Sequence, residues 1–552
     1  MVASNSSSVL DQRTRAGVEA KILELELALA GLKKQLNTFT PISSVPSDIL
    51  RRIFQYVQES AGGERDQRSG RPQWMMEINA DSQLSWIKAL THVCSGWREL
   101  AIDTPTLWTE VNLLSRVLSS EMLKRSQPAP ISLAYIWASS SRIGLPSSWE
   151  LLEQEMHRIQ SLSLELPDAG YDTVISSLRL AGDPTILQAC SFSARPPTTY
   201  YSYIRGPHSS GSIVELPWKI LTNSTSTLQH LHLDRCIFEL RTRPVDDIIY
   251  LPQLTKLSVA QDNVSTLISC LAHITFPPTC SVSLGFRHSQ GEDLALLQLL
   301  ITISTLWEAK VAVGQVIRTL EFRPGRLEGS VCISFSSEVT EDYLTFNIPS
   351  TSTTLLQDIL KLAPLEQVQR LVVNFTLTDL LWTFLARSCP DVRSISSGTS
   401  SILECLKSIH IGGDQLFPNP GSSPGSTDPS PQEAFRRLEK LELPKARATR
   451  WSLVSSRDLL MECIKQRAEL EIPIKSLAFP ENFVEEDEYL GRLASYVRGA
   501  VIRTDPQFGS DFDSSEGYVC RHPVYRRPPL AASVSESSAS YRVDTDSGSG
   551  SD

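Results

Sequence analysis

The chain has 552 residues and a mass of 61.3 kDa, with 41% hydrophobic and 21% charged residues. These proportions are typical of folded proteins, and they exclude a wholly disordered chain, a collagen and a simple coiled-coil rod. The formal charge of −10 gives no net positive field that would attract nucleic acid, so we expect no nucleic-acid partner.

Several features predict an intracellular protein. The ten cysteines are scattered without a CxxC pair, as expected of small buried side chains in a reducing compartment. Residues 1–10 lack the apolar core of a signal peptide. The most apolar run, Leu294–Ile303, is interrupted by Gln298 and Thr302 and is shorter than the ~18 residues that a membrane-spanning helix needs. We therefore predict a cytoplasmic or nuclear location and no membrane contact.

Residues 1–14 are polar and serine-rich and are predicted to be disordered, and residues 15–40 are predicted to form an amphipathic helix. Its apolar side chains alternate at spacings of four and three residues, which is a heptad seam. The seam consists of Val18, Ile22, Leu25, Leu29, Leu32, Leu36 and Phe39. Two interpretations remain open: residues 18–39 form a coiled coil that makes a homodimer, or the seam packs on the downstream domain of the same chain.

Residues 41–111 are predicted to form a small helical domain. A first helix opens at Pro46 and has a broad apolar face. Residues 58–82 are polar and predict a surface loop. A second helix is expected from Gln83 to Ile102, with Gly96 in its interior at a cost of about 1 kcal/mol, and Thr104-Pro105 should end it.

The motifs of this domain occur in a specific order. Val45-Pro46-x-x-Ile49-Leu50-x-x-Ile53-Phe54 is followed by Val93-Cys94-x-x-Trp97-Arg98-x-Leu100-Ala101 and then by Thr104-Pro105-x-Leu107-Trp108. This combination resembles the F-box, and more closely the F-box-like domain of the large families in mushroom-forming basidiomycete fungi, in which a short heptad helix often precedes the box. Val45 departs from the leucine that is usual before the proline. The same residues taken singly would also suit a small helical domain with a tryptophan-anchored core.

The resemblance implies a partner and a function. An F-box binds the Skp-type adaptor of a Skp/cullin/F-box ubiquitin ligase, and through it the cullin, while the rest of the chain holds a protein substrate. The residues that match the adaptor-binding motif are Pro46, Ile49, Leu50, Ile53, Phe54, Val93 and Trp97. The first alternative is an F-box-containing interaction scaffold that acts outside a ubiquitin ligase.

A second pattern, apolar-x-x-Leu-x-apolar, returns between residues 115 and 503, and it is the core of a leucine-rich repeat. It begins at Ile159, Leu228, Leu254, Ile317, Val368, Leu406, Leu438 and Ile474. The intervals between central positions are 69, 26, 63, 51, 38, 32 and 36 residues, against about 20–29 in regular repeats. We predict an α+β or α/β fold: an N-terminal helix, the helical domain, and an irregular leucine-rich-repeat-like solenoid of strand and helix units. The alternative is a set of unrelated strands in an α/β domain.

Within this region, helices are expected over Ser455–Leu470 and Val484–Val497, and residues 412–432 are predicted to be a disordered insertion. Residues 504–552 are predicted to be a disordered, acidic, serine-rich tail. Outward strand positions are the candidate substrate-binding residues, because they would line the concave side of a solenoid. They are His230, His232, Asp234, Lys256, Ser258, Thr319, Glu321, Arg370 and Val372.

No P-loop, GxGxxG, HExxH or GxSxG signature is present, so we predict a non-enzyme without cofactor or metal. His230 and His232 would share a strand face but lack further ligands beyond Asp234. An enzyme with a diverged site in the repeat region is the remaining alternative. The identity of the substrate does not follow from the sequence.

Overall fold

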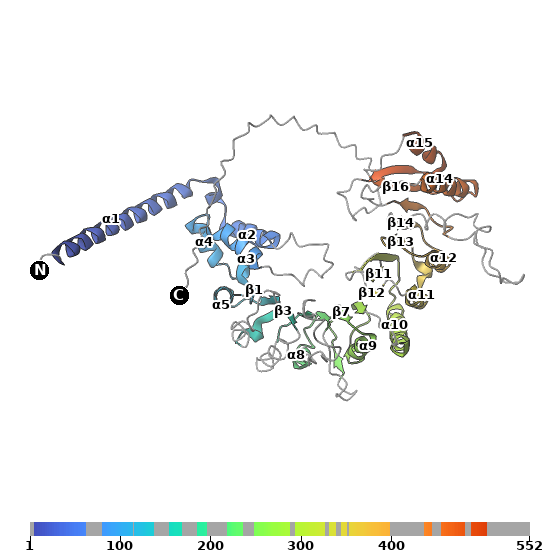
Figure 1. Cartoon of the computed structure of the whole chain (residues 1–552), viewed down its shortest axis with the longest axis horizontal. Helices are drawn as coiled ribbons and strands as arrows, with labels where there is room; N and C mark the ends of the chain where they lie inside the picture. The colour runs from blue at the N-terminus through green and yellow to red at the C-terminus, as the bar shows by residue number, and fades with distance from the viewer. Residues whose placement is uncertain are drawn as a thin grey trace, which may run out of the picture. The chain divides into compact units, whose positions relative to one another are not determined.

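A computed structural model describes residues 5–61, 80–113, 115–136, 154–167, 185–195, 218–235, 248–286, 293–325, 330–337, 344–349, 353–397, 435–443, 454–480 and 487–504 (Figure 1). All of them lie in one compact unit that ends at Asp505. The predicted insertion 412–432 lies outside the described residues, and so does the predicted tail 504–552 except for Thr504, which belongs to a strand. Most of the predicted loop 58–82 also lies outside them, but residues 58–61 and 80–82 are helical, so the prediction of a loop is wrong at both ends.

The N-terminal part is helical. It comprises α1 (Asn5–Thr38), η1 (Pro41–Ser44), α2 (Ser47–Ala61), α3 (Ala80–Thr91), α4 (Ser95–Ile102) and η3 (Pro105–Trp108). The helix α1 starts at Asn5, although residues 1–14 were predicted to be disordered. Once the seam residues are helical, each residue added to the helix costs little free energy, because the unfavourable first turn has already formed. Thr104-Pro105 ends α4 and begins η3, as predicted.

The single helix predicted over Gln83–Ile102 is wrong. The chain breaks between α3 and α4, where the extended residue Cys94 caps α4 and its Sγ accepts a hydrogen bond from the backbone N–H of Trp97 at 3.4 Å. Gly96 therefore lies in the first turn of α4 and not in a helix interior, so the expected cost does not arise.

The rest of the described chain is built on one large sheet, with strands in the order β1-β2-β3-β4-β5-β7-β9-β12-β11-β10-β13-β14-β15-β16-β17. Among these strands, β11 alone runs antiparallel to its neighbours. The bounds are β1 Glu110–Asn112, β2 Ile131–Ile136, β3 Ile159–Pro167, β4 Ala189–Arg195, β5 His230–Asp234, β7 Lys256–Gln261, β9 Ser281–Phe286, β10 Thr319–Pro324, β11 Ser330–Ser336, β12 Leu344–Pro349, β13 Arg370–Val373, β14 Ser394–Ser397, β15 Lys440–Glu442, β16 Ser476–Pro480 and β17 Ala500–Thr504. A separate pair joins β6 (Ile249–Tyr250) and β8 (Ile274–Thr275).

Helices connect many of the strands, and successive helices contact one another: α9 with α10, α10 with α11, α11 with α12, and α14 with α15. They run along the outer side of the strands in Figure 1. Their bounds are α5 Arg116–Arg125, α8 Trp218–Asn223, α9 Val264–Ala272, α10 Asp293–Ala312, α11 Thr353–Leu362, α12 Asp379–Ser388, α14 Val454–Glu469 and α15 Asp487–Tyr496. The last two match the helices predicted over Ser455–Leu470 and Val484–Val497.

The repeated leucine pattern forms the core of this sheet. Every occurrence except the one at Leu406, which lies outside the described residues, falls on a strand, and its apolar side chains are buried. The central positions align in register across β2, β3, β4, β5, β7 and β9, as Leu133, Leu162, Cys190, Leu231, Leu257 and Val282. Because the side chains of a strand alternate, the residues between these positions form the opposite, polar face.

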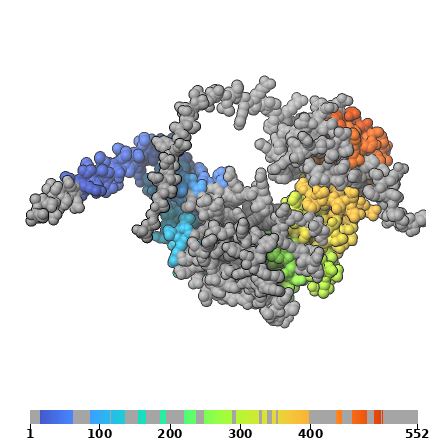
Figure 2. All heavy atoms as spheres, viewed as in Figure 1, coloured from blue at the N-terminus to red at the C-terminus, as the bar shows by residue number. Residues whose placement is uncertain are grey.

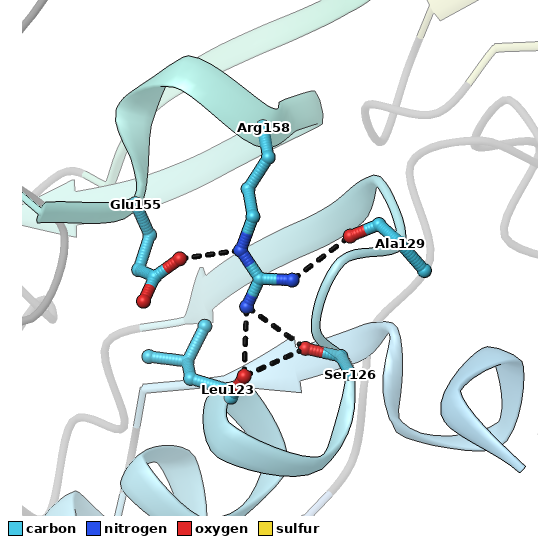
Figure 3. A network of polar contacts seen from close by, with 5 residues as sticks. All are labelled: Leu123, Ser126, Ala129, Glu155 and Arg158. Atoms are coloured by element: carbon cyan, nitrogen blue, oxygen red, sulfur yellow. Dashed lines mark hydrogen bonds and ion pairs between the residues drawn. The ribbon is translucent and has the colours of Figure 1, made fainter.

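A buried arginine connects α5 and the turn after it to β3 (Figure 3). Arg158, before β3, donates to the carbonyl oxygens of Leu123 at 2.8 Å and Ala129 at 2.9 Å, and to the Ser126 hydroxyl at 3.0 Å. Its Nε pairs with Glu155, and only 7% of its side chain is exposed. The guanidinium thus satisfies one carbonyl group in the last turn of α5 and one after the helix, and it holds this turn against β3.

One described helix, α10, is long and apolar enough to cross a membrane by length and composition alone. In this structure it contacts α9 and α11, and it buries Leu299, Ile303, Trp307 and Lys310. The buried Lys310 and the contacts with α9 and α11 indicate that α10 packs as part of the sheet domain.

Candidate functional site: a two-sided helix and a polar sheet face

The motif residues of α2 divide between two faces of the helix. Leu50 and Phe54 point into the core, with 8% and 0% exposure, whereas Ile49 and Ile53 remain 42% and 39% exposed. At 100° per residue, Tyr56 falls on the same stripe as Ile49 and Ile53, and it is 71% exposed. We call Ile49, Ile53 and Tyr56 the α2 stripe; Pro46, before the helix, is also exposed.

The inner face of α2 packs on α4 and η3. The rings of Phe54 and Trp97 lie 5.1 Å apart between centroids, and those of Trp86 and Trp108 lie 5.6 Å apart. The indole N–H of Trp108 donates to the carbonyl of Ala101 at 2.8 Å. The ordered tryptophan motifs of the sequence therefore make one small core.

This core changes the roles of several predicted adaptor-binding residues. Leu50 and Phe54 are buried, so their side chains are not open to a partner in this structure, and Trp97 is half-buried against Phe54. Val93, between α3 and α4, is 56% exposed. The sequence motif did not include Tyr56, although its spacing of i+3 from Ile53 was a readable signal.

The predicted substrate-binding residues lie on the polar sheet face in two separate groups. On β5 and β7, His230 is in register with Lys256, and His232 is in register with Ser258. Farther along the sheet, on β10 and β13, Thr319 is in register with Arg370, and Glu321 with Val372. Strands β9, β12 and β11 separate the two groups, so the structure does not bring them together.

His232 is buried, with 2% exposure, which contradicts the prediction of an open polar position. Its neighbours Ser191 and Ser193 on β4 and Glu165 on β3 are also buried, at 1%, 6% and 7%. Alternation along a strand fixes the direction of a side chain but not what covers it, which is why the sequence pattern failed here. Asp234 accepts a hydrogen bond from Ser193 at 3.1 Å.

The amino-terminal half of the polar face contains a pocket of about 270 Å³. Glu110 on β1 and His230 on β5 stand at its two ends, and small side chains form its floor: Ser132, Ala134, Ser161, Ser163 and Ala189. Gln160, Gln188 and Gln229 line it at the start of three neighbouring strands. The amide of Gln160 donates to that of Gln188 at 2.7 Å. We call these three residues the glutamine row.

The pocket offers a mixture of donors and acceptors with little charge. Burial, and then the nearby charge of Lys256, lowers the pKa of His230, which favours the neutral imidazole at pH 7. Glu110 supplies a carboxylate at the other end. Such a surface can bind a polar, uncharged or weakly basic segment by hydrogen bonds. Except for His230, the sequence analysis did not single out these residues.

The carboxy-terminal half of the polar face is crossed by ion pairs. Glu442 on β15 lies 2.5 Å from Lys440 and 4.0 Å from Arg370, and Glu321 lies 3.4 Å from Arg323. These side chains are partly exposed, so each pair contributes little to stability, about 0–1 kcal/mol. Glu321 and Arg323 neutralise each other, whereas Glu442 is shared by Lys440 and Arg370 and that group keeps one positive charge. Arg370 and Glu321 therefore each have a partner of opposite charge.

The described residues hold no group of three side chains suited to bind a metal ion. Burial raises the pKa of Cys280, Cys389 and Cys463 to about 12, so these thiols stay protonated at neutral pH.

Comparison with known proteins adds no identification. No protein-family model matches the chain, and no curated protein matches it.

Proposed function

We propose that this chain is the substrate-recognition subunit of a Skp/cullin/F-box ubiquitin ligase. In this proposal, residues 41–111 are an F-box-like domain that binds the Skp-type adaptor, and the sheet region binds a protein substrate. The observation that carries the proposal is the division of the motif residues: Leu50 and Phe54 build the core, while Ile49 and Ile53 remain as an exposed apolar stripe on the same helix. Exposed apolar side chains in a row are typical of an interaction surface.

The sheet region is, in the same proposal, a degenerate leucine-rich-repeat solenoid. The aligned central residues of β2 to β9 are separated by 29, 28, 41, 26 and 25 residues, and most of these intervals are near the regular repeat length. Three of these strands, β2, β4 and β9, were not found by the sequence pattern. In β4, Leu187-x-x-Cys190-x-Phe192 has cysteine in place of the central leucine. In a solenoid the strands line the binding side, which assigns the substrate to the polar face.

The mechanism requires no reactive group from this chain. Binding a substrate on one surface and the adaptor on another raises the local concentration of a substrate lysine beside the ubiquitin-loaded enzyme. The expected location is the cytoplasm or the nucleus, where such ligases work. A scaffold that binds the adaptor without the cullin is the second candidate function.

The decisive experiment is co-purification of the full chain with a Skp-type adaptor and a cullin. We expect a stoichiometric complex with wild-type chain and its loss in the double variant Ile49→Lys, Ile53→Lys, because lysine keeps the helix but removes the apolar contact. The matched control is Val117→Lys, since Val117 on α5 is 82% exposed and should not contact the adaptor. Circular dichroism would verify the fold of each variant.

The outcomes separate the candidates. Retention of both partners by wild type and loss only in the α2 variant would support the ligase subunit. Retention of the adaptor without the cullin would support the scaffold. If neither protein binds, residues 41–111 are a helical domain with another role, and the proposed function is wrong.

A further inference from the structure

The helix α1, together with Phe39 directly after it, carries an apolar seam that no described part of the chain covers. The exposed fractions are 59% for Val18, 50% for Ile22, 59% for Leu25, 52% for Leu29, 64% for Leu32, 67% for Leu36 and 83% for Phe39. In Figure 2 the part of α1 whose side chains are described is coloured blue. An ion pair between exposed side chains, Lys34 and Glu99 at 3.7 Å, connects α1 to α4 without involving the seam. The structure therefore does not pack the seam on the downstream domain.

The spacing of the seam matches a second copy of itself. If Ile22, Leu29 and Leu36 are the a positions of a heptad, then Val18, Leu25, Leu32 and Phe39 are the d positions. In a parallel pair, each a residue packs against the same a residue of the partner helix, and each d residue against the same d residue. A helix with this 3.5-residue repeat can therefore bury its seam against a second copy of itself. A β-branched residue at a with leucine at d favours two strands, and this combination occurs at Ile22 and Leu25; leucine occupies the other two a positions.

The flanking charges favour the parallel arrangement. In a parallel pair, Lys21 at position g faces Glu26 at position e of the other helix, and this attractive contact occurs twice. The remaining g-to-e contacts pair Lys33 with Ala28, which carries no charge. The antiparallel register that sets residue 25 opposite residue 29 would place Glu26 against Glu26, a like-charge contact, although it would also bring Glu19 near Lys33. The other antiparallel register, with residue 25 opposite residue 36, would pair Glu26 with Lys33 but would leave Val18 without a partner layer. The parallel pair has no repulsive contact and fills every layer of the seam.

We propose that two copies of the chain associate through residues 18–39 as a parallel, in-register, two-stranded coiled coil. The seam is about three heptads long, so the dimer should be in concentration-dependent exchange with monomer. Because α1 ends just before η1 and α2, a parallel dimer brings both copies of the helical domain to the same end of the coiled coil. A partner with two binding sites would then be held by both copies, with a gain in avidity.

The first test is sedimentation velocity of the full chain over a concentration series. We expect the mass to rise from 61.3 kDa toward twice that value. The double variant Leu25→Lys, Leu32→Lys should stay monomeric. The matched control, Leu23→Lys with Leu27→Lys, should dimerise like wild type, because those residues are exposed to 57% and 66% but lie off the seam, at positions b and f. Adaptor binding should be unchanged in both variants, which keeps this test independent of the proposed function.

The second test determines the orientation of the helices with single cysteines. In the parallel pair, Leu25→Cys chains face one another, and so do Leu29→Cys chains, so each variant should form a disulfide with itself under mild oxidation. In one antiparallel register, residue 25 lies opposite residue 29, so cross-linking would require a mixture of the two variants. In the other, residue 25 lies opposite residue 36, and neither the single variants nor the mixture would cross-link. The proposal is wrong if sedimentation shows that the wild-type chain is monomeric or forms an oligomer larger than a dimer. It is also wrong if the seam and control variants sediment alike, or if disulfides form only in the mixture of the two cysteine variants.

A third variant should strengthen the association. Gly31 lies at an outward position, and a Cβ added there meets no atom within 4 Å. Gly31→Ala should raise the dimer population several-fold at equal concentration, because alanine favours the helix that the dimer requires. If Gly31→Ala leaves the dimer population unchanged or lowers it, dimer formation does not depend on the helical structure of α1, and this result would contradict the proposal.

Discussion

The ring of Phe54 lies 5.1 Å from that of Trp97, and this contact joins the first motif of the helical domain to the second. Phe54 is fully buried, while its neighbour in sequence, Ile53, is 39% exposed. One residue of the motif therefore stabilises the fold, and the adjacent one is open to a partner.

This relationship predicts that Phe54→Ala and Ile53→Ala have different effects. Phe54→Ala should lower the free energy of unfolding by about 3–5 kcal/mol, because it leaves a cavity beside Trp97. Ile53→Ala should change it by less than about 1 kcal/mol, since much of the side chain is already in water. Urea denaturation followed by tryptophan fluorescence would measure both. Equal losses of stability would contradict the assignment of the two faces.

Arg158 should be among the most sensitive positions of the sheet domain. Arg158→Met removes donors to the carbonyls of Leu123 and Ala129 and leaves the carboxylate of Glu155 buried without its partner, so we expect a loss of about 3–5 kcal/mol. Chemical denaturation provides the measurement. Lys361→Met is the control, because its ion pair with Asp358 is exposed and should be worth less than about 1 kcal/mol. A neutral Arg158→Met would show that the network is not required.

Lys310 predicts a pH dependence of stability. Its Nζ donates to the carbonyls of Cys280 at 2.7 Å and Pro278 at 3.0 Å, and burial lowers its pKa from 10.5 to about 8. Between these pH values the unfolded chain binds a proton that the folded chain has released. Stability from this group therefore rises as the pH increases from 8 to 10.5, and it is lost as the pH falls toward 8.

The measurement is the difference in unfolding free energy between wild type and Lys310→Met from pH 7 to 9.5. It should shift in favour of wild type with rising pH, by up to about 1.4 kcal/mol per pH unit above pH 8. The buried thiols act with the opposite sign, because the raised pKa of Cys280 makes folding less favourable once unfolded thiols ionise. That contribution is common to both proteins and cancels in the difference. A flat difference would refute the assignment.

The break between α3 and α4 predicts the effects of two further substitutions. Cys94→Ser should preserve or improve the cap of α4, because a hydroxyl accepts a hydrogen bond better than a thiol, whereas Cys94→Ala should cost about 1 kcal/mol. Gly96→Ala should be neutral or slightly stabilising, since the nearest atom to its new Cβ is the Sγ of Cys94 at 4.0 Å. Thermal unfolding midpoints would rank the three variants. A large loss in Gly96→Ala would argue against this helix boundary.

The sequence predicted those parts of the fold in which local pattern and burial coincide. The strands with Leu-x-Leu stand where they were expected, because the alternation of their side chains and the core impose the same register. Strand β4 was missed because Cys190 replaces the leucine of the pattern, although a buried cysteine fills the same apolar position. The antiparallel direction of β11 could not be predicted, because apolar and polar side chains alternate in the same way in parallel and antiparallel strands.

The candidate sites were less predictable, because they depend on what covers a residue. His232 and Lys256 both belong to the polar face, yet His232 is 2% exposed and Lys256 is partly open. The glutamine row consists of residues at strand beginnings, and only the pairing of those strands brings the three amides together. Contacts between residues so far apart in sequence depend on tertiary structure, which a linear pattern does not contain.

The reversed strand β11 has a consequence for how the sheet folds and unfolds. Strands β1 to β9 can form by adding each unit to the one before it, and so can β13 to β17, because neighbours in space are also neighbours along the chain. At the junction, β9 pairs with β12 and β13 pairs with β10, so residues 319–349 must close as a three-stranded unit before the two blocks become continuous. We expect this unit to limit the cooperativity of unfolding along the sheet. Hydrogen exchange should then show two groups of strands that open separately, β1 to β9 on one side of the unit and β13 to β17 on the other.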